Sequence, residues 1–253
     1  QDTAAVYIEN PTFLGIIETQ GEEIGKLAKA AGAEFIVYTD PISLGVLEAP
    51  ANYGATICVG DLHGLGLHLN FGGGQAGFIA SHDDMRYITE FKELVDGMVE
   101  TTVPGEQGYS VVLIERTHYA MRENGKEFTG TQNNLWTAPV AVYLSLMGPK
   151  GMEEIGHTIM TNAKYAAKKL AGIPGVSLRF PSVFFKEFVV NFDKTGKTVE
   201  EINQLLLSRQ IFGGVDLSRD YPELGQSALY CVTETADKES IDQLAGALQA
   251  ILN

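Results

Sequence analysis

The sequence predicts an α/β fold for the first 149 residues and a smaller α+β domain for residues 172–253. Three observations lead to this prediction. Short, uninterrupted apolar runs alternate with a helical stretch in the first part, a long amphipathic stretch covers residues 150–171, and shorter strands with capped helices follow it. Continuous apolar strands joined through helices are typical of a sheet that is covered on both faces. We therefore expect a large domain over 1–149, a connecting helix over 150–171 and a small domain over 172–253.

The large domain is predicted to begin with strands and one clear helix. Apolar runs with the length of strands lie at residues 4–8, 34–38, 56–59, 77–80 and 109–114. Between the first two runs, Ile24, Leu27 and Ala28 recur at helical spacing, and Gly32 is a typical helix stop. This region therefore predicts a strand–helix–strand unit followed by further strands.

The rest of the chain carries clear helix signals. Helices are predicted at residues 133–147 and 150–171, and strands at 175–180, 187–192 and 228–232. Gly148-Pro149 separates the two helices, because proline cannot continue the hydrogen bonding of a helix interior. Thr198 and Glu201 form a capping box that opens a helix, and Asp237 is the expected cap of the last one.

The composition limits the classes of function. The 253 residues carry a formal net charge of −14, which argues against nucleic acid and anionic membranes as partners. No apolar run approaches the roughly 20 residues that span a bilayer. Cys58 and Cys231 are predicted to be buried free thiols, and with neither a signal peptide nor a CxxC motif we expect a cytoplasmic protein. Because Gln1 leads within a few residues into a core strand, we also expect that the chain continues a longer polypeptide.

Asp40 is a candidate binding residue, because it follows a predicted buried strand and precedes Pro41. Ligands of α/β sheets collect at the carboxyl ends of the strands. An Asp there could pair with a protonated ring nitrogen, such as that of pyridoxal phosphate (PLP). The alternative is a turn residue that bonds its own backbone, and spacing alone favours this turn.

Between Lys29 and Lys92 the chain contains no lysine. Enzymes that use PLP hold it as a Schiff base with a lysine, and no other side chain replaces that primary amine. If the flanking strands and Asp40 belong to such an enzyme, its lysine is missing. The chain would then be the non-catalytic partner of a pair, or half of a site that is completed elsewhere.

Two histidines and a run of glycines lie within this lysine-free stretch. His63 could stack on a ring or carry a proton, although a histidine in a loop is the simpler interpretation. His63 and His68 lack a third ligand at recognisable spacing, so no metal site is predicted. The glycines at 72–74 favour a tight turn over an anion site, because they lack the spacing of a phosphate-binding loop.

Arg116 and Arg122 bracket a polar loop ahead of Trp136. Arginines in such a loop could bind a carboxylate or a phosphate. They could equally form surface ion pairs that contribute little. The sequence alone leaves both interpretations open.

Seven longer segments together resemble one known family. They are NPTFLGIIE (10–18), TDPISLGVLEAP (39–50), YGATICVGD (53–61), FGGGQAGF (71–78), VYLSLMGPKGM (142–152), FFKEFVV (184–190) and GGVDLSRDYPELGQSALYCVTE (213–234). In this order they resemble the C-terminal part of subunit 1 of the P-protein family of the glycine cleavage system. The last segment is the most specific, because no helix or strand requires its Tyr-Pro-Glu-Leu-Gly.

The resemblance implies an aspartate-aminotransferase-like fold and a subunit that lacks the Schiff-base lysine, which relatives carry near residues 64–65. It implies no catalytic residue and no covalently bound cofactor in this chain. PLP is expected on a lysine-bearing subunit 2, and the heterodimer is expected to decarboxylate glycine and pass the aminomethyl group to the lipoyl arm of the H-protein. Asp40 and His63 would line a degenerate cofactor site, and Arg116 and Arg122 would contact substrate or an interface.

The chain departs from the family pattern in two places. Gly74-Gln75 stands where the family usually has Pro-His, and NGKEFT at residues 124–129 replaces a characteristic polar run. The second departure leaves open a non-catalytic paralogue that acts as a scaffold or regulator. A self-sufficient PLP enzyme conflicts with the absent lysine. In each case we expect further chain or a tight partner to lie against the strands near Ala4 and Glu34, because unpaired strand edges favour aggregation.

Overall fold

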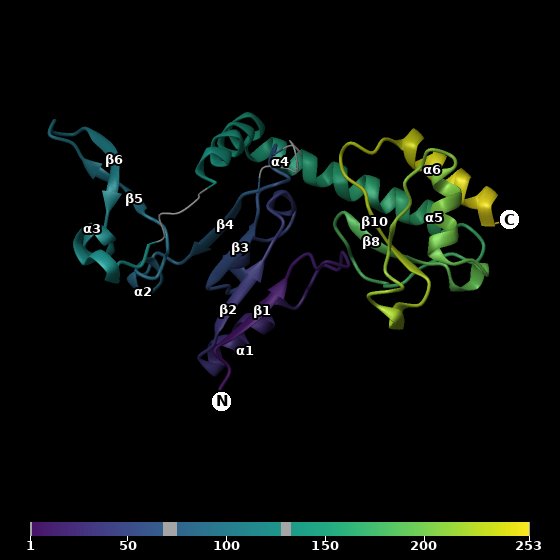
Figure 1. Cartoon of the computed structure of the whole chain (residues 1–253), viewed down its shortest axis with the longest axis horizontal. Coiled ribbons are helices and arrows are strands. Elements are labelled where there is room, and N and C mark those ends of the chain that lie inside the picture. The colour runs from purple at the N-terminus through teal and green to yellow at the C-terminus, as the bar shows by residue number, and fades with distance from the viewer. Residues whose placement is uncertain (1, 68–74, 128–132, 253) are drawn as a thin grey trace.

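The computed structural model describes residues 2–67, 75–127 and 133–252. These residues form three parts in a row: a hairpin module, a central sheet and a small C-terminal domain (Figure 1). Helix α4 (Asn134–Ala171) runs from the central sheet into the small domain. Within the described ranges, no helix is both long and apolar enough to cross a bilayer.

The central sheet has the strand order β1-β2-β3-β4. Its strands are β1 (Ala5–Glu9), β2 (Glu34–Tyr38), β3 (Ile57–Asp61) and β4 (Gly77–Ser81). The first three are parallel, whereas β4 runs antiparallel to β3. Helix α1 (Gly21–Ala31) joins β1 to β2 and ends at Gly32, whose left-handed conformation (φ 70°) glycine adopts at little cost. The predicted strand–helix–strand unit is therefore confirmed.

Helix α1 covers one face of this sheet. Its Ala28 packs with Phe35 and Val37 of β2 and with Ala55, and all four side chains are buried. Val37 is fully buried, with 0% of its surface exposed. Ile24 and Ala28 of the expected apolar stripe thus pack against the sheet, whereas the prediction is wrong for Leu27, which is 66% exposed.

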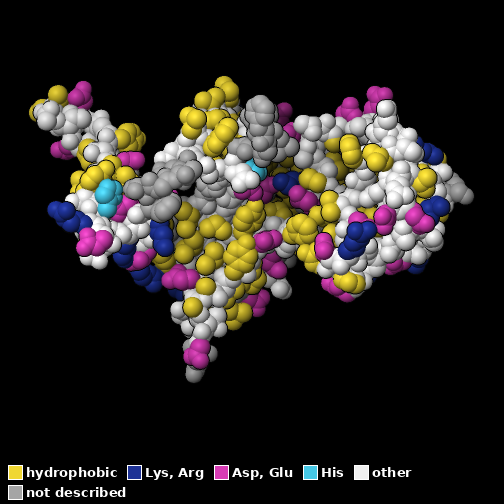
Figure 2. All heavy atoms as spheres, in the orientation of Figure 1, with side chains coloured by type: hydrophobic (Ala, Val, Ile, Leu, Met, Phe, Trp, Pro, Cys, Tyr) yellow, Lys and Arg dark blue, Asp and Glu magenta, His cyan; other side chains and the backbone are white. Residues whose placement is uncertain are grey.

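The opposite face, which we call the open face, has no buried residue among those described. Strand pairing places its larger side chains in two rows: Tyr7, Ile36 and Ile57, then Tyr38, Val59 and Ile79. Tyr7 and Ile79 are 54% and 57% exposed. Figure 2 shows apolar side chains gathered over this part of the molecule. The expectation of a sheet covered on both faces is therefore wrong for the described residues, because Tyr87 and Arg86 contact Glu34 at the rim of the open face but leave no residue of its two rows buried.

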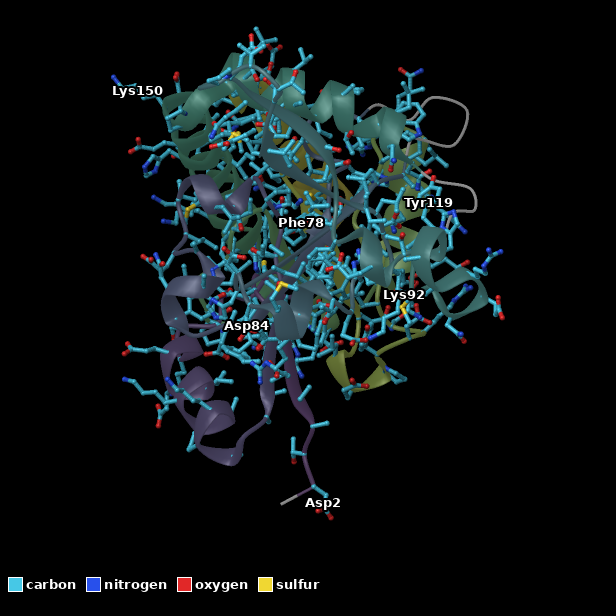
Figure 3. The ribbon with its side chains drawn as sticks, turned by 90° about the vertical axis from the view of Figure 1, so that its left-hand side faces the viewer. Asp2, Phe78, Asp84, Lys92, Tyr119 and Lys150 are labelled. Atoms are coloured by element: carbon cyan, nitrogen blue, oxygen red, sulfur yellow. The ribbon has the colours of Figure 1, made fainter. Side chains whose placement is uncertain are left out.

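A small module projects from the central sheet beyond β4. It contains α2 (Met85–Ile88), β5 (Val95–Glu100), β6 (Gln107–Val112) and α3 (His118–Met121). Strands β5 and β6 form a separate two-stranded sheet, and Figure 3 shows Lys92 and Tyr119 on this module, which faces the viewer. The strand predicted at 109–114 overlaps β6, but it does not extend the central sheet. We call residues 82–127 the hairpin module.

Helix α4 bends where the sequence predicts a break. Gly148 has non-helical angles (φ 58°, ψ −179°) within it, and Pro149 starts the second segment. The first segment lies beyond the carboxyl ends of the central strands, where Val140 packs with Ile42 and Leu65, and the second enters the small domain (Figure 1). The two predicted helices are thus present as the two segments of α4, separated at Gly148.

The small domain closes its core within the described chain. Its sheet has the antiparallel order β7-β8-β10-β9, with strands β7 (Ser177–Leu178), β8 (Glu187–Asn191), β9 (Val215–Asp216) and β10 (Ser227–Cys231). Helices α5 (Val199–Leu207) and α6 (Lys238–Leu252) pack with α4 around fully buried Leu170, Val190, Phe192 and Leu248. The capping box of Thr198 and Glu201 is present as predicted. Short 3-10 turns lie at Ser43–Gly45, Pro50–Tyr53, Ile114–Arg116, Arg122–Asn124, Asp193–Thr195 and Pro222–Leu224.

Candidate functional site

A pocket of ≈ 440 Å³ lies between the central sheet and the small domain. The central sheet contributes residues at or just beyond the carboxyl ends of its parallel strands, and the small domain contributes the starts or ends of β8 and β10. The charged side chains that line it are Glu9, Asp40, Asp61, His63, Lys186 and Glu187. Acidic, basic and histidine side chains meet at this junction in Figure 2. This is the edge at which α/β folds bind their ligands.

Asp40 takes the turn role that spacing alone favours, and its second carboxylate oxygen is paired with a lysine of the small domain. Its Oδ1 accepts a hydrogen bond of 3.0 Å from the backbone N–H of Ile42, as an aspartate that starts a turn does. Its Oδ2 faces the pocket and accepts a charge-assisted hydrogen bond of 2.5 Å from Lys186 Nζ. The carboxylate is therefore held by the turn on one side and by a cation on the other.

Lys186 immediately precedes β8 and comes from the small domain. Its side chain is only 27% exposed and that of Asp40 is 17% exposed. Burial alone would lower the pKa of Lys186, but the carboxylates of Asp40 and Glu187 outweigh it and raise that pKa above its usual value. Lys186 is thus a permanent cation in the pocket at neutral pH.

Asp61 is the last residue of β3 and places a second carboxylate in the pocket. Its Oδ2 accepts a hydrogen bond of 2.5 Å from Tyr38 Oη, and its Oδ1 accepts one of 2.9 Å from the backbone N–H of His63. Burial alone would raise the pKa of Asp61, but these two hydrogen bonds outweigh it and lower that pKa. The His63 side chain lines the pocket, and the residue as a whole is exposed.

Glu187 and Cys231 complete the small-domain side. Burial raises the pKa of the Glu187 carboxyl, against the opposing effect of Lys186. Cys231 is a free thiol as predicted, but it is exposed and not buried. Its Sγ lies 3.5 Å from Glu187 Oε1, and partial loss of hydration together with this carboxyl raises the pKa of the thiol to about 12. A thiol with this pKa is protonated at neutral pH and is a weak nucleophile.

The residues of this pocket do not fit bound PLP. Asp40, the carboxylate that would pair with the ring nitrogen, is already paired with Lys186. Four carboxylates, counting Glu9, line the pocket and disfavour a phosphate group. Leu65, at the segment where the resemblance places the lysine, is 2% exposed and packs in an apolar cluster with Ile42 and Phe185. The chain therefore presents no amine at that position.

The two predicted arginines lie outside this pocket, in or next to the hairpin module's last turns. Arg116 is 6% exposed and donates hydrogen bonds of 2.6 Å and 2.5 Å to the backbone carbonyl oxygens of Phe91 and Glu93. Arg122 is exposed and has a left-handed backbone (φ 50°). The side chain of Arg116 thus holds the module together, and contact of either arginine with substrate or a partner stays a prediction.

Some predicted features lie outside the described residues. They are His68, glycines 72–74, and residues 128–129 of the NGKEFT segment. In the described ranges, no group of three or more His, Cys, Asp or Glu side chains is arranged to hold a metal ion. The sequence did not reveal Lys186 or the other charged pocket residues Glu9, Asp61 and Glu187. Lys186 was missed because its partner Asp40 lies 146 residues away. The one local signal was a lone lysine directly before an apolar strand.

Comparison with known proteins gives a consistent result. The family model described as "Glycine cleavage system P-protein" matches residues 1–248. A probable glycine dehydrogenase (decarboxylating) subunit 1 of Pyrococcus furiosus is 37% identical over 251 residues, which are 99% of this chain and 55% of that protein. The corresponding protein of Saccharolobus islandicus is 38% identical over 252 residues, which are 100% of this chain and 53% of the relative. The chain thus spans about half the length of the curated relatives it matches.

Solved structures agree on the fold. A crystal structure of glycine decarboxylase (P-protein) of the glycine cleavage system, in inhibitor-bound form, matches 98% of this chain and 55% of its own, with a TM-score of 0.87 and 32% identity. A NifS-like protein from Rickettsia africae matches 98% of this chain and 62% of its own, with a TM-score of 0.67 and 16% identity, which supports the fold alone. The predicted aspartate-aminotransferase-like α/β fold is confirmed.

Proposed function

This chain belongs to the glycine cleavage system P-protein family, and from that premise we propose that it is the lysine-less subunit of a glycine decarboxylase. In this proposal a second, lysine-bearing subunit holds PLP, and this chain holds none covalently. The assembled pair decarboxylates glycine and transfers the aminomethyl group to the lipoyl arm of the H-protein. We expect the assembly to work in the cytoplasm.

The observation that carries the proposal is that the pocket at the sheet edge lacks a free lysine amine and a free Asp40. The pocket lies at the carboxyl ends of the parallel strands, where α/β folds bind their ligands, yet Leu65 is buried in an apolar cluster and Asp40 is paired with Lys186. Decarboxylation of an amino acid through PLP requires a lysine amine that is free to form the Schiff base, whereas Lys186, the lysine of this pocket, is held as a cation by Asp40 and Glu187. A chain with this pocket contributes to such a reaction only as part of an assembly.

The open face supports the need for an assembly. Its rows of apolar side chains, Tyr7 and Ile79 among them, are half-buried or exposed in this chain. Exposed apolar surface of this kind marks a contact site, because leaving it in water costs free energy. We expect the open face to be covered in the assembled enzyme.

The test is reconstitution. The longest native polypeptide that contains this sequence is co-expressed with a lysine-bearing subunit 2, and the purified complex is assayed for glycine–bicarbonate exchange. We expect exchange with both subunits and none with either alone. Failure to form a complex, or exchange by this chain alone, would contradict the proposal.

A scaffold or regulator built on the same fold is the second candidate, and the NGKEFT departure at residues 124–129 favours it. Restoring family-like residues in this segment distinguishes the two functions. If the native complex forms but catalyses exchange only after this replacement, the scaffold interpretation holds. If the native complex is already active, the decarboxylase interpretation holds.

A further inference from the structure

Asp40 and Lys186 form an ion pair across the boundary between the central sheet and the small domain. Asp40 follows β2, whereas Lys186 precedes β8, and Nζ lies 2.5 Å from Oδ2. Lys186 Nζ also lies 3.7 Å from Glu187 Oε1. The pair therefore joins two parts of the molecule that the sequence separates by 146 residues.

This pair is more deeply placed than an ordinary surface ion pair. Its side chains are 27% and 17% exposed, whereas those of the Lys26–Glu22 pair on α1 are 72% and 71% exposed. Exposed pairs contribute little to stability because water competes with them. Removing one partner of a desolvated pair leaves an uncompensated charge, which is costly.

The backbone on both sides of the pair is fixed. Asp40 Oδ1 is held by the N–H of Ile42. Next to Lys186, the loop after β1 approaches β8 so closely that a Cβ at Gly15 (φ 85°) would lie 1.9 Å from the carbonyl oxygen of Glu187. The N–H of Ile17 donates a hydrogen bond of 3.0 Å to the carbonyl oxygen of Val183 in the same region. The two charges are therefore presented to each other by backbone that is already in place.

We propose that Lys186 is the permanent counter-ion of Asp40 and a positioning residue that holds the small domain against the central sheet. Its ammonium group takes the place at Asp40 that the ring nitrogen of a cofactor would otherwise occupy. The inference deepens the proposed function, since it explains how a subunit without PLP keeps the arrangement of its two domains. The ion pair makes that arrangement independent of any ligand. The pocket is accordingly closed to PLP, covalent or not.

A double-mutant cycle tests the pairing in the native complex, or in the full chain if no partner is present. The variants are D40N, K186M and D40N/K186M, with K26M on the exposed pair as the matched control. We expect each single pocket variant to lower Tm by about 4–8 °C and the double variant to lower it by at least about 3 °C less than their sum. K26M should change Tm by less than about 1 °C. Additive effects of the two pocket variants would overturn the proposal.

Two further readouts separate positioning from a general loss of stability. K186R, which keeps the charge, should recover at least about half of the Tm lost in K186M. Hydrogen exchange of residues 10–18 and 187–191 should rise roughly tenfold in K186M, with exchange in α6 unchanged. Equal increases in all three regions, or no rescue by arginine, would contradict a positioning role.

A third experiment tests whether the pocket binds the cofactor, with PLP itself as the probe. Native chain without its partner should leave the absorbance spectrum of added PLP unchanged. Binding of PLP that is lost in D40N would show Asp40 free for a cofactor and would overturn the proposal. Complex formation with the lysine-bearing subunit is scored separately, so failure of the ion-pair proposal and failure of the proposed function give different results.

Discussion

The small domain and the central sheet are each built on four strands, but only the small domain closes its core within the described chain. In the small domain, α4, α5 and α6 bury β8 so completely that Val190 is 0% exposed. In the central sheet, α1 covers one face and the other is left without a buried residue. The difference teaches that one chain can hold a self-sufficient folding unit beside a surface that depends on an assembly.

The largest effect is expected from a substitution that opens a cavity in the core of the small domain. Leu248→Ala in α6 removes a side chain that is 0% exposed, and we expect it to lower the free energy of unfolding by about 3 kcal/mol. Leu27→Ala on α1 is the matched control, because Leu27 is 66% exposed and its loss should cost less than about 0.5 kcal/mol. Denaturant unfolding measures both, and equal losses would break the comparison.

The next largest effect on stability is expected in the hairpin module. Arg116→Ala removes two hydrogen bonds to backbone carbonyl oxygens, and we expect a local cost of about 2 kcal/mol, because the donor is charged. Limited proteolysis of residues 82–127 should then become faster. Arg122→Ala, at an exposed position, should leave the rate unchanged. If the two variants behave alike, Arg116 does not anchor the module.

A charged substitution on the open face distinguishes an effect on folding from an effect on assembly. We expect Val59→Lys to change the unfolding free energy of the isolated chain by less than about 1 kcal/mol, because Val59 is only half-buried. The same variant should weaken association with the partner subunit by roughly tenfold or more, because the charge would be buried without a counter-ion. Association measured by sedimentation or calorimetry decides the point, and unchanged affinity would show that the partner subunit does not cover the open face.

The smallest predicted effect concerns pH. The hydrogen bond from Tyr38 helps to lower the pKa of Asp61, so this carboxylate stabilises the folded state above its unfolded pKa of about 3.9. That contribution is lost as pH falls through the folded pKa. Tyr38→Phe should therefore cost about 1 kcal/mol at pH 7 and show a shallower loss of stability between about pH 5 and pH 3 than the native chain. Parallel acid limbs in urea titrations would contradict this role of Tyr38.

Much of the local structure could be predicted from the sequence because it depends on neighbouring residues. The helix stop at Gly32, the capping box at Thr198 and the break at Gly148 each follow from the conformational preferences of one or two residues. Asp40 was placed correctly just after β2 for the same reason. These signals lie within a few positions of the structure that they specify.

The features that the sequence did not reveal depend on distant residues. The pair of Asp40 with Lys186 arises only when the small domain folds against the central sheet. An apolar strand such as β3 has the same sequence pattern whether its second face meets a helix of its own chain or another polypeptide, so the open face could not be foreseen. Strand β5 (VDGMVE) escaped prediction because its Asp and Gly are unfavourable in strands.

The most direct test of the account is to find which subunit carries the cofactor. The complex of this chain with its lysine-bearing partner is loaded with PLP and reduced with borohydride, and peptide mass spectrometry locates the modified lysine. The account predicts that the modified residue belongs to the partner subunit and that Lys186 and the other lysines of this chain stay unmodified. A stoichiometric label on any lysine of this chain would contradict it.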